Sequence, residues 1–527
     1  MHTLTLKNQS FFRPASRPTS PAPGLPSRPD SGIGFERTAH PLNRLSLSTF
    51  RRASPAPTPT AIPALPTLVQ DGSYLEMLNL KLSEAVSKAF VQPSGPATAN
   101  ELVCGKRPVP AGRGRALGAL ITSELQATRE NPHLYRAILR CLHRPLSVLL
   151  SNLSAHLLPL LSSSAFLTPA APMPQMPNPN PTQLHALALA GIAGELLETF
   201  DDLRLGLEVD VRGEGLKMIR DSLVSVVSRV IDPLMGGIKA ELMHLIVALE
   251  NPISITAGPL KILAGTKPST IQHPSIVALQ SMMPIYARAL IRYTQWTTSQ
   301  ATLASLLISL LWRGLVALAN RPYQSVSPPG SPGLNSAVVK GQRQSASMSP
   351  PATPPSVRFA IKLPPSRPPS PPSVQVPSTA SADARALYDL LSLLPRPVAA
   401  SQLAHEAVDE AFDGLKGVAA LLEAEQTNAF AKGGQTELER LTADLPTLIA
   451  LPIVLRGYCP TFRTVAEMLG ISEDEYRKGC LLGFSRAEEC AAAVGQRVLA
   501  VLTNEPHTLA NVIVTKWLEV DVATADD

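Results

Sequence analysis

The sequence predicts an all-α protein in which two helical regions, bundle-like or arranged as an irregular solenoid, are separated by a disordered segment rich in proline and serine. Apolar residues recur at three- and four-residue steps over most of the chain, whereas no useful length alternates with the period of two that a strand requires. The 52 prolines are also unevenly placed. Residues 1–66 hold 12 of them and residues 321–381 hold 15.

Both proline-rich segments contain few large apolar side chains, so they cannot bury enough surface to offset the entropy lost on ordering. With 527 residues, the chain is also long enough for two or three domains. We therefore expect a disordered basic tail (1–66), an N-terminal helical domain (67–320), a disordered basic linker (321–381), an acidic C-terminal helical domain (382–520) and a flexible end (521–527).

The predicted helices of the N-terminal region follow from apolar spacing. The first helix carries Leu75, Leu78, Leu82, Val86 and Ala89 on one face. Prolines and glycines divide the rest, and two prolines are expected to start or kink a helix, Pro233 and Pro284. The further helical stretches are 115–130, 132–161, 182–207, 214–250 and 273–320.

Beyond the linker, the predicted helices cover 382–394, 399–429, 435–456, 461–470, 472–503 and 506–517. The helix 472–503 has the most regular pattern, because its apolar residues step by 4, 4, 3, 4, 3, 4 and 3. We expect this seam to pack in a bundle core, with a dimerising coiled coil as the alternative. Its members are Tyr476, Cys480, Phe484, Ala487, Ala491, Val494, Val498 and Val501.

The net charge of +6 is the sum of parts with opposite signs. Residues 1–66 carry 8 basic and 2 acidic side chains and residues 321–381 carry 6 and none, whereas residues 382–527 carry 12 and 22. The basic tail and linker can therefore dock on the acidic C-terminal region, an acidic partner, RNA or an anionic membrane. Net charge alone does not choose among these partners.

Cysteine usage favours a reducing compartment. The five cysteines are widely spaced and form no CxxC pair, which argues against a disulfide framework and a zinc site. The first 13 residues lack the apolar run of a secretory signal. The N-terminus is rich in Arg and Ser, as in a mitochondrial transit peptide, but prolines from residue 14 onward break the required helix. We expect a cytoplasmic or nuclear protein, with the mitochondrion as the alternative.

The predicted disordered parts carry candidate regulatory motifs. Each candidate phosphosite precedes a proline, as in targets of proline-directed kinases, and each phosphate adds about −1.5 to −2 charges. The linker also resembles an SH3-domain ligand at Lys362, Pro365 and Pro368, because a polyproline II helix has three residues per turn and places both prolines on one ridge. The candidate phosphosites are Ser20, Ser54, Thr58, Ser327, Ser331, Ser349, Thr353 and Ser370.

The segment 461–490 has the spacing of a DNA-binding helix-turn-helix, with Ala466, Gly470 and Tyr476 at the small, turn and apolar positions. Its second helix, however, opens with acidic residues 473–475, which would face phosphates with the wrong sign. The acids have a structural explanation, because Ser472 and Glu475 form a capping box at the positive end of a helix dipole.

A basic glycine-rich loop precedes the predicted helix at 115–130. Its backbone and guanidinium groups are candidates for holding an anion at a helix N-terminus. It lacks the ending of a P-loop and a preceding strand, which argues against nucleotide hydrolysis. The candidate anion-binding residues are Lys106, Arg107, Arg113 and Arg115.

Two windows without charge, between Arg144 and Glu195 and between Arg292 and Arg313, raise the question of a membrane span. Neither contains the roughly 20 clean apolar residues of a spanning helix, so we expect buried helices and at most a peripheral membrane role.

No catalytic or metal-binding motif stands out. His405 and Glu406 are followed by Asp409 in place of the second histidine of a zinc-protease helix. We assign no catalytic residue, cofactor or metal, and expect a non-enzymatic regulatory scaffold or adaptor that binds protein partners through helical modules and is tuned by phosphorylation. The alternatives are a nucleic-acid-associated factor that uses segment 461–490 and a peripheral membrane protein.

Overall fold

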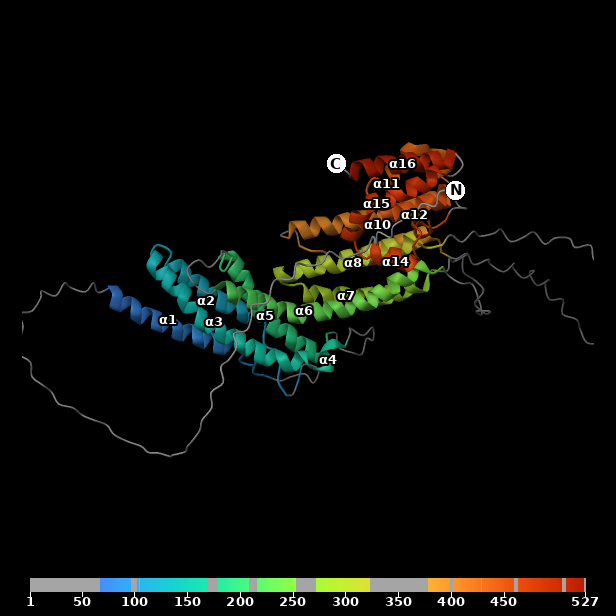
Figure 1. Cartoon of the computed structure of the whole chain (residues 1–527). Coiled ribbons are helices and arrows are strands. Elements are labelled where there is room, and N and C mark those ends of the chain that lie inside the picture. The colour runs from blue at the N-terminus through green and yellow to red at the C-terminus, as the bar shows by residue number, and fades with distance from the viewer. Residues whose placement is uncertain are drawn as a thin grey trace, which may run out of the picture. The chain divides into compact units, whose positions relative to one another are not determined.

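The computed structural model confirms the all-α fold (Figure 1). It describes residues 67–95, 102–103, 105–168, 179–207, 216–252, 272–322, 378–398, 401–427, 429–458, 463–504 and 509–525. Over these residues the chain forms helices and no strand, apart from one isolated bridge between Val103 and Lys106. The predicted disordered tail, and all but the first two and last four residues of the predicted linker, lie outside them.

The chain divides into two units, residues 1–74 and residues 75–527. Helix α1 (Thr67–Ala89) crosses this boundary and continues into the second unit. There its predicted apolar face is buried at Leu78, Leu82, Val86 and Ala89. The helices that pack on one another, from α2 to α16, belong to this second unit.

Small residues bring α2 (Arg113–Ala127) and α5 (Pro181–Asp202) into close contact. A Cβ at Gly114 would lie 2.3 Å from the carbonyl oxygen of Ile192, and one at Gly118 would lie 2.0 Å from Oγ1 of Thr199. Helix α3 (Pro132–Leu161) packs beside them, followed by the short α4 (Ser164–Leu167). The close approach of α2 to α5 therefore depends on these two glycines.

Helix α6 (Leu216–Val247), followed by the 3₁₀ turn η2 (Ala248–Glu250), packs against α3, α5, α7 (Pro274–Tyr293) and α8 (Gln300–Ala319). A second 3₁₀ turn, η3 (Thr297–Ser299), precedes α8. Both prolines that the sequence singled out lie within helices, Pro233 in α6 and Pro284 in α7.

The segment Thr297–Ala319, which contains η3 and α8, is long and apolar enough to cross a membrane by length and composition. Of its most apolar window, 67% is buried inside the protein. Burial of this kind is typical of a core helix.

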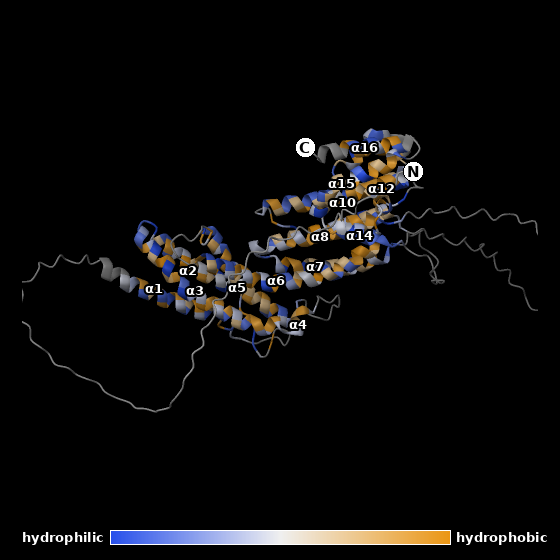
Figure 2. Cartoon of the chain, viewed as in Figure 1, coloured by the Kyte–Doolittle hydropathy of each residue, from blue (hydrophilic) through white to orange (hydrophobic). Residues whose placement is uncertain are grey.

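The C-terminal helices pack on the N-terminal ones. They are α9 (Ala380–Leu391), α10 (Gln402–Gln426), α11 (Phe430–Thr442), α12 (Thr447–Tyr458), α13 (Val465–Leu469), α14 (Glu473–Gly479), α15 (Phe484–Thr503) and α16 (Leu509–Ala525). Helix α10 packs against both α8 and α9, and its buried residues are almost all apolar. Figure 2 shows the hydropathy of the residues along α8 and α10. Leu387 of α9 approaches Gly314 of α8 so closely that a Cβ there would lie 2.7 Å from the leucine.

The prediction of one continuous helix over 472–503 is wrong, because the chain breaks between α14 and α15 at Cys480–Gly483. The indole N–H of Trp312 donates to the Leu481 carbonyl oxygen at 3.2 Å, which gives a backbone group in the break a buried partner. Within the seam, Tyr476, Cys480, Ala487, Val494 and Val498 are buried, whereas Phe484 is 43% exposed.

Candidate functional site

The segment 323–377 leaves and re-enters the described structure at one place, beside a buried ion pair. Arg321 follows α8 and Asp383 lies in the first turn of α9, and their side chains pair while only 5% and 2% exposed. The hydroxyl of Ser378 donates to the other carboxylate oxygen of Asp383. We call these three residues, Arg321, Ser378 and Asp383, the clasp.

The clasp satisfies a charge that would be costly to bury alone. Both oxygens of Asp383 accept a hydrogen bond, and its position in the first turn of α9 places it at the positive end of the helix dipole. Thr379 caps the start of α9, since its Oγ1 accepts a hydrogen bond from the N–H of Ala382 at 3.2 Å. The chain is therefore anchored on both sides of segment 323–377.

A second set of polar contacts, made by Arg456, lies at the end of α8, close in the sequence to Arg321 of the clasp. Arg456 of α12 donates to the carbonyl oxygen of Ala319, the last residue of α8, and its Nε lies 3.1 Å from Oε1 of Glu425 in α10. Carbonyl groups at a helix C-terminus lack partners within the helix, and a guanidinium is well suited to supply one. Helices from both sides of segment 323–377 thus meet where that segment begins.

Most sequence-predicted regulatory residues lie outside the described part of the chain. These are Lys362, Pro365 and Pro368 of the SH3-type motif and the eight candidate phosphosites. Their assignments stay predictions.

The basic loop at 105–115 is described, and its helix N-terminus already holds an anionic group of this chain. The carboxylate of Glu195 in α5 accepts the backbone N–H groups of Gly112 at 2.7 Å and of Arg115 at 3.0 Å. Gly112 has a φ of 86°, a conformation that favours glycine. An external anion at these N–H groups would have to displace Glu195.

The four basic side chains of this loop differ in exposure. Lys106 and Arg115 are exposed, and Arg115 lies 3.8 Å from Glu198. Arg107 and Arg113 are half-buried. Anion binding by the four residues therefore stays a prediction.

The helix-turn-helix-like segment forms α13 and α14, joined through Gly470 in the left-handed conformation. The predicted capping box of Ser472 and Glu475 is confirmed, with hydrogen bonds in both directions. Arg477, the arginine of the second helix, pairs with Glu250 of η2 and also lies 3.8 Å from Glu473. The acids 473–475 are exposed, so α14 presents mainly negative charge to solvent.

The described residues bring no three His, Cys, Asp or Glu side chains together in a way that could hold a metal ion. Cys141, Cys480 and Cys490 are free thiols. Burial is the main cause that raises the pKa of Cys480 to about 12, and a hydrogen bond with Cys490 raises it further in the same direction. Cys104 and Cys459 lie outside the described residues. A thiol with so high a pKa is a poor nucleophile at neutral pH.

Sequence reasoning missed the clasp. Its charged residues are 62 positions apart, and apolar periodicity carries no information on which distant charges pair. In comparisons with known proteins, no protein-family model matches the chain, and neither does any curated protein or solved structure.

Proposed function

We propose that the chain is a non-enzymatic regulatory adaptor, whose helical body presents to protein partners the segment 323–377, which connects α8 to α9 and is called the loop below for its place between them. The observation that carries the proposal is the clasp, because it fixes both ends of the segment beside each other on packed helices. A segment held in this way displays motifs to a partner while its base stays in place.

The composition of the loop suits recognition by other proteins. Pro365 and Pro368 follow Lys362 at the spacing of an SH3 ligand, and a polyproline II segment loses little entropy on binding. Such a motif supplies contact area without requiring a folded loop.

Phosphorylation would reverse the charge of the loop. Residues 323–377 contain five basic and no acidic side chains. Phosphates on all five loop sites would add about −7.5 to −10 charges. A partner selected by positive charge would then be released, and one that reads phosphate would be recruited.

The test replaces residues 323–377 by a Gly/Ser sequence of equal length and compares partners by quantitative affinity purification from native cells. We expect partners of the intact chain to be lost. A matched control replaces residues 1–66 in the same way, and thermal unfolding checks that both variants keep the helical body. An unchanged partner set after replacement of the loop would show the proposal to be wrong.

A second arm tests regulation with full-length variants in which the loop sites are changed to Ala or to Asp. We expect the two variants to differ in the abundance of loop-dependent partners, because only the Asp variant neutralises the five positive charges of the loop. Equal abundance in both would remove phosphorylation from the proposal. The changed sites are Ser327, Ser331, Ser349, Thr353 and Ser370.

A further inference from the structure

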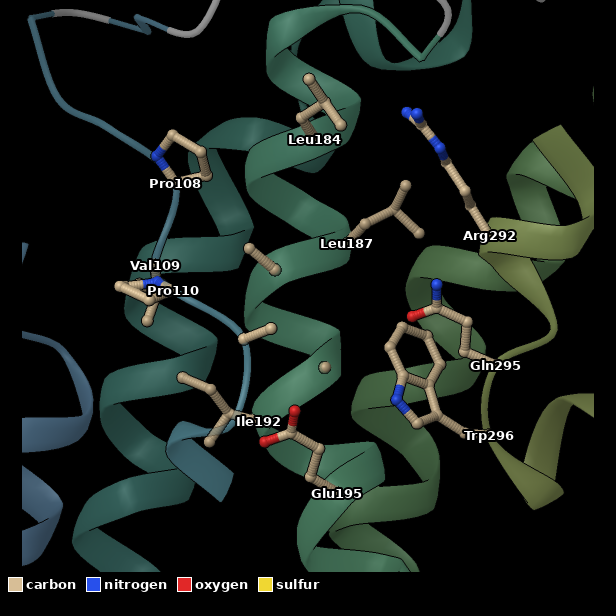
Figure 3. A pocket seen from close by; sticks show the side chains of 13 residues that line it. Pro108, Val109, Pro110, Leu184, Leu187, Ile192, Glu195, Arg292, Gln295 and Trp296 are labelled. Carbon is tan, nitrogen blue, oxygen red and sulfur yellow. The ribbon is translucent and has the colours of Figure 1, made fainter. Parts of the chain in front are cut away.

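A pocket of about 310 Å³ lies between α5, the loop 108–111, and the end of α7 with the residues that follow it (Figure 3). Its volume is at the lower end of the roughly 300–1,000 Å³ typical of ligand sites. Its lining contains no residue of the clasp or of segment 323–377, so the inference drawn from it does not rest on the proposed adaptor function.

One wall is the indole of Trp296, which lies flat on α5. A Cβ at Gly194 would lie 2.4 Å from Cγ of Trp296, and one at Gly191 would lie 3.3 Å from its Cζ2. The two glycines therefore provide the surface on which the ring rests. Leu187 and Ile192 continue the apolar lining along the same helix (Figure 3).

The opposite wall is the chain at Pro108–Ala111, and Glu195 fixes it. The Glu195 carboxylate accepts the N–H groups of Gly112 and Arg115, so the wall is tied to α5 immediately after residue 111. Glu195 is the acidic residue of the lining, and both of its oxygens are engaged in these bonds. The Glu195 carboxylate is therefore directed at the N-terminus of α2, where the helix dipole offsets part of its charge.

The polar side of the pocket is formed by Arg292 and Gln295, near the end of α7 (Figure 3). Arg292 is exposed, and no acidic side chain among the described residues pairs with it. A guanidinium binds carboxylates with charge-assisted hydrogen bonds, and the Gln295 amide offers a further donor. An apolar lining with one uncompensated cation at its edge is complementary to an amphipathic anion.

We propose that this pocket binds a small amphipathic carboxylic acid, with its apolar body against Trp296 and Leu187 and its carboxylate on Arg292. The volume selects short acids over long lipid chains. The shape of the site, with fixed walls on both sides, favours a ligand that enters a preformed space.

The test uses fluorine NMR of the full chain labelled with 5-fluorotryptophan, titrated with octanoate and with octanol as the uncharged probe of similar size. The chain has 3 tryptophans, and the other two serve as internal controls. Trp312 donates to the Leu481 carbonyl and Trp517 donates to Oγ1 of Thr442, away from the pocket. We expect octanoate to move the Trp296 resonance and leave the other two unchanged.

Two substitutions separate the charge from the cavity. Arg292→Gln should weaken octanoate binding about tenfold or more, since one charge-assisted hydrogen bond is lost, and should leave octanol binding unchanged. The matched control is Arg288→Gln, which removes an exposed arginine one turn earlier on α7. Ala188→Phe, which fills the pocket from α5, should abolish binding of both probes.

A Trp296 resonance that does not respond to octanoate overturns the proposal. So does equal octanoate affinity in the intact chain and in Arg292→Gln, because the pocket would then be an apolar crevice without anion recognition. Thermal unfolding of each variant, with the unmoved Trp312 and Trp517 resonances, verifies that the fold is retained.

Discussion

Gly194 of α5 lies directly against the ring of Trp296, with no room for a side chain between them. A Cβ there would be 2.4, 2.6 and 2.7 Å from three atoms of the indole. Such distances are well inside van der Waals contact, so a methyl group at this position forces the ring or the helix to move. The packing of α5 against the turn after α7 therefore depends on this glycine.

The first prediction is that Gly194→Ala destabilises the protein by about 1–3 kcal/mol, the usual cost of overpacking a well-filled core. The matched control is Gly236→Ala within α6, where nothing lies within 4 Å of the added methyl group. There the gain in helix propensity should stabilise by about 0.5–1 kcal/mol. Urea unfolding followed by circular dichroism measures both, and a stabilising Gly194→Ala would contradict the packing described.

The second prediction concerns the clasp. Asp383→Asn leaves the buried guanidinium of Arg321 without a counter-charge and should destabilise by about 3–5 kcal/mol. The control is Glu423→Gln, which breaks the exposed pair of Arg385 and Glu423 and should change stability by less than about 1 kcal/mol. Equal effects of the two substitutions on the urea midpoint would show that the clasp is not effectively buried.

Local sequence signals predicted the helix ends well where those ends have capping residues or a proline at the first position. Helix α3 covers the predicted 132–161, because Asn131 caps it through the Leu134 N–H and Pro132 occupies its first position. The Ser472–Glu475 capping box likewise placed the start of α14 correctly to within one residue. These signals act within a few residues and need no tertiary contact.

Contacts between residues far apart in the chain could not be predicted from the sequence. The apolar seam continues through Cys480 without interruption, yet the helix breaks there, where Leu481 meets Trp312 from 169 positions away. The clasp and the pocket escaped prediction for the same reason, since Arg321 meets Asp383 and Trp296 meets Gly194 only after the helices have packed. Periodicity identifies which face of a helix is buried and does not identify its partner.

The third prediction compares two buried tyrosines. No described residue accepts from the Tyr476 hydroxyl, whereas the Tyr286 hydroxyl donates to Oε2 of Glu241 at 2.7 Å. Burial raises the pKa of both phenols. Tyr476→Phe should be neutral or stabilising, and Tyr286→Phe should destabilise by about 1.5–3 kcal/mol, because it removes a hydrogen bond to a charged group. Thermal or urea unfolding checks the order of the two, and the reverse order would contradict the structure.

The fourth prediction is a loss of stability at alkaline pH. Burial raises the pKa of Tyr293 from 10.0 to about 12, while neighbouring Arg292 acts weakly in the opposite direction. Between these values the folded protein keeps a proton that the unfolded chain releases, so this contribution is complete below pH 10 and is lost as the pH rises toward 12. The free energy of unfolding should therefore fall over this window, by on the order of 1 kcal/mol per pH unit for one such group. Tyr293→Phe should fall less steeply than the intact chain in urea unfolding at several pH values from 9 to 12, and identical slopes would exclude Tyr293 as a contributor.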